Sequence, residues 1–396
     1  MNDLIIIHDV ANHAHKSLYA TKFSSKKRML ETITDQHSFI KKMTTDFAFI
    51  MRMLGQPNQV IMTLDERSWR KDIDMLEQNT GYKANRVKDN NVVNWDAFNE
   101  LTSDFLDILS KNGFTKSVLK GCEGDDLMFF WAEKFYQQGD CVIICSGDGD
   151  ITQLNKYSEN NFICCFNTKS TSRQVIGAPG FGDWLKKRLN EPANAFDIFM
   201  TSNYLSSPLE TINSLINQTK LVEIDPNEVL FEKIVCGDAG DNIPAILTWE
   251  TTQKNGKIIN NKISPLKAAL IKEKILDKGN GCDVRNLSQY ADIFVKEIKN
   301  IYDKDIDKIT IQQRLERNTT LVLLSKQTIP LQIQNKFEEH YINLKDFSNP
   351  RLDKMSMSAI LEGTKYYTGS NSFDCDIFAG ISETDIKPIN ITKSLF

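Results

Sequence analysis

The sequence is poor in the residues that usually bind zinc. It contains 5 histidines in 396 residues, and its 8 cysteines show neither Cys-x-x-Cys pairs nor histidine partners at zinc-binding spacing. Cys141, Cys145 and the adjacent Cys164 and Cys165 lie in apolar stretches. We therefore expect reduced, mostly buried thiols and no zinc site.

Long apolar runs are also missing. No stretch approaches the ~20 consecutive apolar residues of a membrane-spanning helix, and the start Met1-Asn2-Asp3 lacks the basic residues and apolar core of a signal peptide. With 41% hydrophobic and 25% charged residues, the composition is typical of a soluble globular protein. At ~100 to 200 residues per domain, the length predicts two or three domains. We expect a cytoplasmic protein without membrane contacts.

The sequence does contain acidic residues directly after apolar segments. Leu4–Asp9 and Val60–Asp65 each end in an aspartate, and Asp148 and Asp150 follow closely after Cys141–Cys145. An unbroken apolar run predicts a strand buried on both faces, as in a parallel sheet. Because parallel strands end at one edge of the sheet, where ligands usually bind, we expect these carboxylates to lie close together.

Two further acidic stretches extend this pattern. Lys120–Leu127 places three carboxylates at the start of a predicted helix, and Cys236–Pro244 places two in a loop. Taken singly, aspartates in turns cap helices or form Asx-turns, and that interpretation explains any one stretch equally well. Nine carboxylates in five short stretches favour a metal site. They are Asp9, Asp65, Glu123, Asp125, Asp126, Asp148, Asp150, Asp238 and Asp241.

The chemistry of these candidate ligands indicates which metal ion the site would hold. Many carboxylate oxygens with almost no histidine indicate a hard cation, Mg²⁺ or Mn²⁺. Nine carboxylates are too many for one octahedral ion. Two ions ~3.5–4 Å apart would fit, one activating a water and the other stabilising the leaving oxygen of a phosphodiester. Such a site needs no nucleophile from the protein.

Basic residues are available to bind a phosphate. The net charge is −4, but without the nine carboxylates it would be +5, so the overall charge does not exclude a nucleic-acid partner. The segment from Asp65 to about residue 93 predicts a loop or short helical lid over the site, and its Arg70, Lys83 and Arg86 would bind the phosphate. The alternative for any basic cluster is a solvated face, which we favour for Lys186–Arg188. The clusters are Lys22–Arg28, Arg67–Lys71, Lys83–Lys88 and Lys186–Arg188.

The order of elements predicts an α/β fold, because strands and helices alternate as a parallel sheet requires. The strands are expected at 4–8, 59–64, 115–119 and 141–145, and the helices at about 35–54, 95–111 and 124–138. After Pro244 the chain is rich in lysine, with helices expected near 264–277, 286–302 and 309–318. From about residue 340 the composition predicts a partly ordered tail.

These motifs, in this order, resemble the 5′-nuclease (flap endonuclease) family, and most closely its ribonuclease H group from large tailed bacteriophages. Asp9 and Asp65 look like the family's first-strand aspartate and the aspartate before its arch. Lys83 and Arg86 lie in a similar Tyr82–Arg86 segment. Three motif matches carry the rest of the resemblance: Glu123-Gly124-Asp125-Asp126 for Glu-Ala-Asp-Asp, Gly147–Leu154 for Ser-Asp-Gly-Asp-Phe-Thr-Gln-Leu with Ile151 for phenylalanine, and Gly237–Pro244 for Gly-Asp-x-x-Asp-Asn-Ile-Pro.

The resemblance covers roughly 1–176 and 223–330 and implies a fold. It implies a central, mostly parallel sheet flanked by helices (PIN/5′-nuclease-like), with a helical arch and a C-terminal helical DNA-binding subdomain. The implied division is a catalytic domain at 1–235 with the arch at 66–93 and an insertion at 177–222, a subdomain at 236–340, and an extension or tail at 341–396. In this family Lys83 and Arg86, with Arg70 upstream, would contact the substrate phosphates, and the nine carboxylates would hold two Mg²⁺ ions.

The implied activity is that of a Mg²⁺-dependent 5′ to 3′ nuclease, of ribonuclease H or flap endonuclease type, which removes RNA primers or 5′ flaps in phage DNA replication. The alternatives are a nuclease for recombination or host DNA degradation, and a catalytically inert nucleic-acid-binding relative. An Asp-x-Asp phosphatase is disfavoured, because Val10 and Ala11 follow Asp9. The expected partners of the monomer in the host cytoplasm are DNA, RNA–DNA hybrid, a single-stranded DNA-binding protein and a sliding clamp.

Three features depart from the family pattern. The stretch Ala245–Ser264 lacks the glycine-rich hairpin of many members, which leaves DNA gripping and a K⁺ site there in doubt. The insertion at 177–222 and the tail have no counterpart. The tail ends in Ile391–Phe396, whose apolar Leu395 and Phe396 resemble short clamp-binding C-termini. The alternative is that these two side chains fold back on the nuclease domain or merely end the chain.

Overall fold

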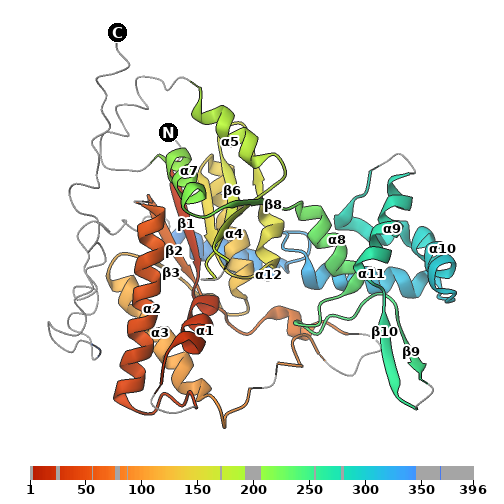
Figure 1. The fold of residues 1–396 in the computed structure, drawn as a ribbon, viewed down its shortest axis with the longest axis horizontal. Coiled ribbons are helices and arrows are strands. Elements are labelled where there is room, and N and C mark those ends of the chain that lie inside the picture. The colour runs from red at the N-terminus through yellow and green to blue at the C-terminus, as the bar shows by residue number, and fades with distance from the viewer. Residues whose placement is uncertain are drawn as a thin grey trace.

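The computed structural model describes residues 3–23, 27–55, 57–75, 81–86, 88–169, 172–191, 207–253, 256–277, 281–344 and 366. Its centre is a mostly parallel sheet flanked by helices, which confirms the predicted fold class (Figure 1). Within those ranges, every helix is too short or too polar to cross a membrane.

The main sheet has the strand order β3-β2-β1-β4-β6-β7-β8, with β5 beside β6. All pairs are parallel except β6 with β5 and with β7. The first four strands confirm the predicted ones, and all six residues of β1 are buried. The strands are β1 (Leu4–Asp9), β2 (Gln59–Thr63), β3 (Thr115–Ser117), β4 (Cys141–Cys145), β5 (Lys156–Tyr157), β6 (Phe162–Asn167), β7 (Gln174–Gly177) and β8 (Leu221–Glu223).

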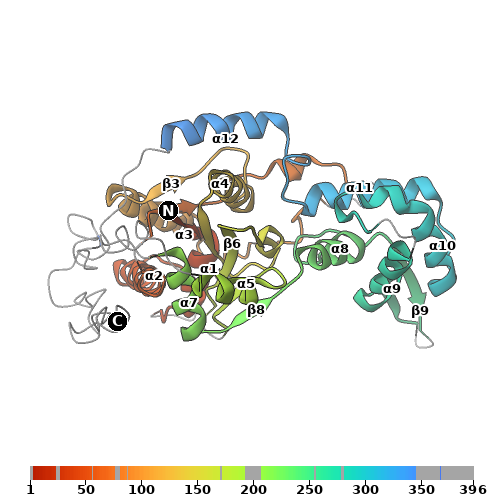
Figure 2. The same cartoon turned by 90° about the horizontal axis from the view of Figure 1, so that it is seen from above.

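Helices cover both faces of this sheet, which explains why the central strands β1, β2 and β4 are buried along their whole length. Leu4 and Ile6 of β1 pack against the helices of one face, and Ile5 and Ile7 against those of the other. One face carries α1 (Val10–Ala20), α2 (Ile33–Leu54), α3 (Trp95–Lys111), α5 (Phe181–Leu189) and α7 (Pro208–Gln218). The other carries α4 (Gly124–Gln138) and α12 (Leu331–Leu344), as Figure 2 shows.

The C-terminal helices form a second apolar cluster beside the sheet (Figure 1). It also includes Met75 and Tyr82 from the segment expected to form the arch. Its elements are α8 (Pro226–Cys236), the hairpin of β9 (Thr248–Thr252) and β10 (Ile258–Lys262), α9 (Pro265–Leu276), the 3₁₀ helix η3 (Val284–Tyr290), α10 (Ala291–Tyr302) and α11 (Lys308–Val322).

The segment 177–222 and the tail, where they are described, both contact the sheet domain. The described part of 177–222 adds β8 as an edge strand beside β7 and packs α5 and α7 on the sheet. In the tail, the described residue Tyr366 is buried, and its hydroxyl donates a hydrogen bond to Asp104 Oδ2 at 2.5 Å. The C-terminal Ile391–Phe396 lies outside the described residues.

Candidate active site

The carboxyl end of β1 is the centre of the site. Asp9 ends β1 and caps α1, where its Oδ1 accepts a hydrogen bond from the Asn12 backbone N–H at 2.9 Å. Its Oδ2 accepts a hydrogen bond from the hydroxyl of Ser146, which follows β4, at 2.7 Å. Because β1 lies between β2 and β4, the residues that follow all three strands meet at Asp9.

Asp65 connects this edge to the start of helix α4. Its Oδ1 accepts a hydrogen bond from the backbone N–H of Gly124, the first residue of α4, at 2.5 Å. A Cβ atom at position 124 would lie 2.9 Å from this oxygen, too close without a shift. Glycine at position 124 therefore lets a carboxylate approach the helix N-terminus, whose partial positive charge stabilises an anion.

Asp125 and Asp148 complete a group of four carboxylates with Asp9 and Asp65. Asp148 is exposed, and its Oδ1 accepts a hydrogen bond from the Asp150 backbone N–H at 2.9 Å. Among the described residues, no ammonium or guanidinium nitrogen lies within 4.0 Å of any of these four carboxylates. We refer to Asp9, Asp65, Asp125 and Asp148 as the open acidic group.

Burial and mutual repulsion disfavour the charged forms of the open acidic group. Burial, with the nearby charge of Asp65, raises the pKa of Asp9 to about 7. Burial and the charge of Asp148 raise the pKa of Asp125 well above its usual range. The pKa of Asp65 is also raised, mainly because the surrounding protein keeps water from its carboxylate, even though the rest of the residue is exposed. A cation placed among these groups would relieve the repulsion.

The other five carboxylates already have cationic partners from the protein. Lys83 Nζ lies 2.5 Å from Glu123 Oε1, and Arg70 Nη2 lies 2.8 Å from Asp126 Oδ1. Burial raises the pKa of Glu123, but Lys83 and Arg70 together hold it below its usual value. We refer to Glu123, Asp126, Asp150, Asp238 and Asp241 as the cation-paired group.

Lys233 supplies the cation for two members of the cation-paired group. It lies in the last turn of α8, and its Nζ contacts Asp150 Oδ1 and, at 2.6 Å, Asp238 Oδ2. Burial alone would raise the pKa of Asp238, but the Lys233 ammonium holds this pKa below its usual value. Burial and the charge of Asp148 nevertheless raise the pKa of Asp150 to about 6. Lys233 was not predicted from the sequence, although a lysine near the end of a helix that leads into an acidic loop is a usable signal.

The fold thus gathers the predicted carboxylates at one edge without forming a finished ligand set. In the described part of the chain, no three His, Cys, Asp or Glu side chains converge with the geometry of a metal site. Backbone N–H groups, lysine and arginine already contact several of these carboxylates.

The sequence itself matches a known family. Residues 4–178 match the family model described as the 5′-3′ exonuclease, N-terminal resolvase-like domain. Residues 4–178 therefore belong to the 5′-nuclease family. This domain contains all four residues of the open acidic group, so the protein is a hydrolase of the nuclease class with 5′ to 3′ polarity. A comparison with curated proteins gave no match.

Several solved structures from bacteriophage T5 are similar. The T5 D15 protein co-crystallised with metal ions has 16% sequence identity and a TM-score of 0.49, covering 86% of this chain and 99% of its own. A variant of the T5 D15 flap endonuclease in a complex with DNA and metal ions has 16% identity and a TM-score of 0.47, covering 86% of this chain and 98% of its own. A mutant T5 5′-exonuclease has 14% identity and a TM-score of 0.46, covering 87% of this chain and 99% of its own.

In this nuclease, the described parts of the segment 66–93 contact both the acidic edge and the loop after α8. The Tyr82 hydroxyl donates hydrogen bonds to Glu123 Oε2 at 3.1 Å and to Asp241 Oδ2 at 3.0 Å. The backbone N–H of Lys83 donates to the Asp241 carbonyl at 2.9 Å, and the Arg86 guanidinium contacts the Asp241 carboxylate. Figure 1 shows the described parts of this segment, in orange, running toward the C-terminal helices.

The expected helical arch is helical only over a short stretch. Among the described residues of 66–93, the helical element is the 3₁₀ helix η1 (Trp69–Asp72), and the residues from Gly81 to Arg86 form turns. Residues 76–80 and 87 lie outside the description. Side-chain contacts to the two acidic stretches, more than helical hydrogen bonds, hold the described part in place.

Arg70 is placed differently from the expectation that it contacts a substrate phosphate. It is 1% exposed, its Nη1 donates to Asp126 Oδ2 at 3.0 Å, and its Nε donates to the Leu321 carbonyl at 3.0 Å. Its guanidinium also lies over the Trp69 ring, 4.6 Å from the centroid. Arg70 therefore neutralises buried Asp126 and joins η1 to α11, and it has no route to a phosphate in solvent.

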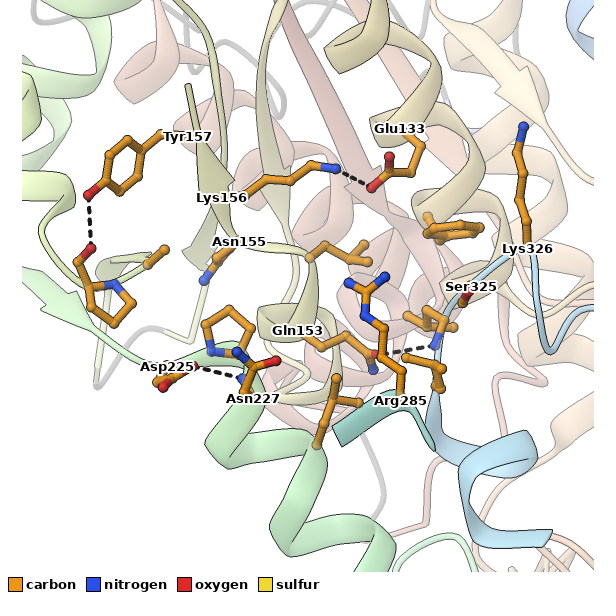
Figure 3. Close-up of a pocket in the computed structure, with 18 of the residues that line it drawn as sticks. Glu133, Gln153, Asn155, Lys156, Tyr157, Asp225, Asn227, Arg285, Ser325 and Lys326 are labelled. Atoms are coloured by element: carbon orange, nitrogen blue, oxygen red, sulfur yellow. Dashed lines mark hydrogen bonds and ion pairs between the residues drawn. The ribbon is translucent and has the colours of Figure 1, made fainter. Parts of the chain in front are cut away.

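A separate cavity of about 550 Å³ lies at the junction of the sheet domain and the C-terminal helices (Figure 3). Its polar lining includes Arg285, Lys326 and the ion pair of Lys156 with Glu133, whose Nζ and Oε1 are 2.5 Å apart. None of the nine carboxylates lines this cavity. The cavity is therefore separate from the acidic edge.

Proposed function

We propose that this protein is a Mg²⁺-dependent 5′ to 3′ nuclease that hydrolyses phosphodiester bonds in RNA primers or 5′ flaps during phage DNA replication. The match to a 5′-3′ exonuclease domain supports the reaction class. The observation that carries the proposal is the open acidic group, in which four carboxylates lie at one sheet edge without a protein cation within 4.0 Å among the described residues. Mn²⁺ would serve as the alternative ion.

The chemistry of the donors fits such ions, because Mg²⁺ prefers carboxylate oxygens. The first ion would be held by Asp9, Asp65, Asp125 and Asp148. The second would be held by Asp150, Asp238 and Asp241, after Lys233 and Arg86 release them. When bound, the two ions would activate a water and stabilise the leaving oxygen of the phosphodiester.

Glu123 and Asp126, also predicted as ligands, would act as positioning residues. Asp126 Oδ2 accepts the backbone N–H of Glu123 at 3.2 Å, which closes the capping box at the start of α4. Both carboxylates also contact Arg70. These contacts would fix the first turn of α4. They would thereby orient Asp125, which lies between Glu123 and Asp126 in the sequence, toward the other members of the open acidic group.

Lys83 and Arg86 would bind the substrate phosphate. The backbone of Lys83 has a left-handed φ of 57°, and its ammonium lies 2.5 Å from Glu123 Oε1 and 3.7 Å from Asp241 Oδ2. Arg86 is exposed apart from its contact with Asp241. A phosphate at the acidic edge would offer both cations a new anionic partner, and charge-assisted hydrogen bonds of this type are strong.

We propose domain boundaries that follow the packing. The catalytic domain would comprise 3–225 together with α12, because Phe337 of α12 stacks on Phe130 of α4 with ring centroids 4.7 Å apart. The DNA-binding subdomain would begin at Pro226, because α8 packs with α9 and α11. This division shifts the expected boundary at 235 and assigns α12 to the sheet domain.

The proposed reaction also implies partners. DNA and RNA–DNA hybrid are the substrates that the proposed reaction requires, and a single-stranded DNA-binding protein and a sliding clamp would bring the monomer to them in the host cytoplasm. For the clamp, deletion of 391–396 should leave cleavage of a short oligonucleotide unchanged and remove stimulation by the clamp. Survival of that stimulation, or a decrease in thermal stability, would assign the C-terminus a structural role.

One observation favours the alternative of an inert nucleic-acid-binding relative. Lys83 and Lys233 place ammonium groups among the carboxylates, where a permanent ion pair would replace a metal ion. In that case the protein would bind nucleic acid with the same affinity with and without Mg²⁺ and would not cleave it.

The test is cleavage of a 5′-labelled RNA–DNA hybrid and of a 5′-flap duplex, each with Mg²⁺ and with EDTA. The proposal predicts cleavage of at least one substrate with Mg²⁺ and none with EDTA. Cleavage in EDTA, or binding without any cleavage over a range of Mg²⁺ and Mn²⁺ concentrations, would contradict it.

A further inference from the structure

The cavity of about 550 Å³ at the junction of the sheet domain and the C-terminal helices is not used by the proposed hydrolysis. Its walls come from α4 and β5 of the sheet domain, from the start of α8, from η3 and from the segment Leu323–Lys326 (Figure 3). Sites for small molecules typically have volumes of about 300–1,000 Å³ and often lie between domains. The size and the position of this cavity therefore both fit a small ligand.

Hydrogen bonds hold one wall of the cavity in place. Gln153 lies in the 3₁₀ helix η2 (Asp150–Leu154) and is 8% exposed. Its Nε2 donates a hydrogen bond to the Val322 carbonyl at 3.2 Å, and its Oε1 accepts one from the Leu324 backbone N–H at 2.9 Å. These bonds join the sheet domain to the segment after α11. This wall is therefore formed before any ligand binds, as is usual for ligand sites.

The two carboxylates that line the cavity already have partners. Glu133 forms the ion pair with Lys156, and Asp225 caps α8 by accepting a hydrogen bond from the Asn227 backbone N–H at 2.8 Å. Arg285 of η3 is exposed, and no carboxylate oxygen of the described residues lies within 4.0 Å of its guanidinium. In Figure 3 this guanidinium lies among the other labelled side chains. It is therefore available to an anion from solution.

A buried amide donor at this cavity also lacks a partner. Asn155 lines the cavity and is 3% exposed, and its Oδ1 accepts a hydrogen bond from the Cys165 thiol at 3.1 Å. Its Nδ2 is buried and donates to no atom of the part of the chain that the structure describes. A buried donor without an acceptor destabilises a protein. An acceptor atom supplied by a ligand would therefore be favourable beside Asn155.

The rest of the lining suits a flat ring that can also form hydrogen bonds. Phe129, Leu154 and Leu230 provide apolar surface, and Gln137 and Asn227 provide further amides. Asparagine and glutamine side chains hydrogen-bond the edges of nucleobases, and a guanidinium binds a phosphate through two parallel hydrogen bonds. A nucleoside monophosphate combines such a ring and such an anion in one small molecule.

We propose that this cavity binds a nucleoside 5′-monophosphate, with the phosphate at Arg285 and the base against the apolar lining near Asn155. The site is distinct from the acidic edge, because none of the nine carboxylates lines it. The inference goes beyond the proposed nuclease function and does not depend on it. A bound nucleotide would contact both the sheet domain and the C-terminal helices, and would thereby stabilise the folded protein.

The test is calorimetric titration of the full chain with dAMP, deoxyadenosine and inorganic phosphate, in EDTA and without nucleic acid. EDTA removes the divalent ions through which a phosphate would bind at the acidic edge. Arg285→Met removes the guanidinium of the cavity. The matched control, Arg188→Met, removes an arginine of α5 that pairs with Glu191 and does not line the cavity. Thermal melting with and without dAMP provides a second measurement.

The wild type and Arg188→Met should bind dAMP with affinities that agree within about twofold. Arg285→Met should bind it at least about tenfold more weakly, because a charge-assisted contact is lost. Arg285→Lys should have an intermediate affinity, since lysine keeps the charge but lacks the planar fork. Deoxyadenosine and inorganic phosphate should each bind the wild type at least about tenfold more weakly than dAMP, because each makes only part of the contacts. Saturating dAMP should raise the melting temperature of the wild type more than that of Arg285→Met.

Three results would overturn the proposal: no binding of dAMP by the wild type, equal affinities of Arg285→Met and the wild type for dAMP, or equal affinities of the wild type for dAMP and inorganic phosphate. The last result would show an anion site that does not recognise the base. A protein that binds dAMP but cleaves no substrate would contradict the proposed nuclease function and support this site. Cleavage without dAMP binding would contradict this inference alone. Melting of each variant without ligand separates a loss of binding from unfolding.

Discussion

The two acidic groups at the edge of the sheet differ in how their charge is balanced. The cation-paired group has its counter-ions built in, with Arg70 against Asp126 and Lys233 between Asp150 and Asp238. The open acidic group has no such partner within 4.0 Å among the described residues, and burial and repulsion raise the pKa of Asp9 to about 7. The comparison teaches that carboxylates close together in one site can differ in what an ion must displace: the cation-paired group would first have to release lysine or arginine, while the open acidic group would not.

The largest expected effect comes from removing one charge of the open acidic group. Asp148→Asn or Asp125→Asn should lower the cleavage rate by about a thousandfold, because the variant loses several kcal/mol of charge stabilisation by the ion. DNA binding should remain, or become tighter, because one negative charge is gone. Single-turnover cleavage at limiting Mg²⁺ measures this, with the exposed Asp183→Asn of α5 as a control. Undiminished turnover in either variant would remove these residues from the site.

The cation-paired group should show its effect on stability instead. Arg70→Met leaves Asp126 buried without its counter-ion, which should lower the free energy of unfolding by about 3–5 kcal/mol. The matched variant Arg67→Met removes an exposed arginine paired with Asp72 at 2.7 Å, and should cost less than about 1 kcal/mol. Urea denaturation distinguishes the two. Equal decreases would mean that the Arg70 pair is no more important than a surface ion pair.

Loss of Lys83 should affect the cleavage rate less than loss of a member of the open acidic group. If it binds the phosphate during the reaction, Lys83→Ala should lower the single-turnover rate by about 100-fold. Substrate affinity should fall by less than about tenfold, because the contact strengthens only as charge develops in the transition state. A variant that cleaves at the wild-type rate at every salt concentration would assign Lys83 to the ion pair with Glu123 alone.

A smaller effect concerns the pH dependence of stability without metal. The pKa of Asp9 is about 7 in the folded protein, against 3.8 as its usual value, so the folded state holds a proton that the unfolded chain has released. Stability should therefore fall as pH rises between these values, by at most about 1.4 kcal/mol per pH unit. Burial lowers the pKa of His8 and of His13, which gives the opposite slope below pH 6.5.

Asp9→Asn is the control for this effect, because it keeps both histidines. The stability of the wild type relative to Asp9→Asn should decrease from about pH 5 to about pH 8 in chemical denaturation with EDTA. A parallel pH dependence in the two proteins would show that Asp9 does not hold the proton.

The sequence was sufficient to predict the parts of the fold that depend on apolar periodicity. β1 and β4 are buried along their whole length because helices cover both faces, and all three carboxylate-bearing strand ends were predicted from their apolar runs. β6 has the same apolar character but was missed, because it follows β4 through η2 (Asp150–Leu154) and β5 without the helix that usually joins parallel strands. β7 and β8 are too short to give a pattern.

The ion pairs were not predictable from the sequence. Arg70 and Asp126 are 56 positions apart, and Lys233 and Asp150 are 83 positions apart. Which charges meet depends on how the segment 66–93 and helix α8 pack against the sheet, and periodicity does not encode this packing. The nine carboxylates could therefore be located at one edge, but their division into two groups required the structure.

Mg²⁺ binding measured by calorimetry without nucleic acid tests this division most directly. Asp125→Asn removes a charge from the open acidic group, and Glu123→Gln removes one from the cation-paired group two positions away. We predict that Asp125→Asn weakens Mg²⁺ binding at least about tenfold, as expected when a ligand is removed, while Glu123→Gln changes it less than about threefold. Equal decreases in both variants, or an unchanged affinity in Asp125→Asn, would contradict the assignment of the ion to the open acidic group.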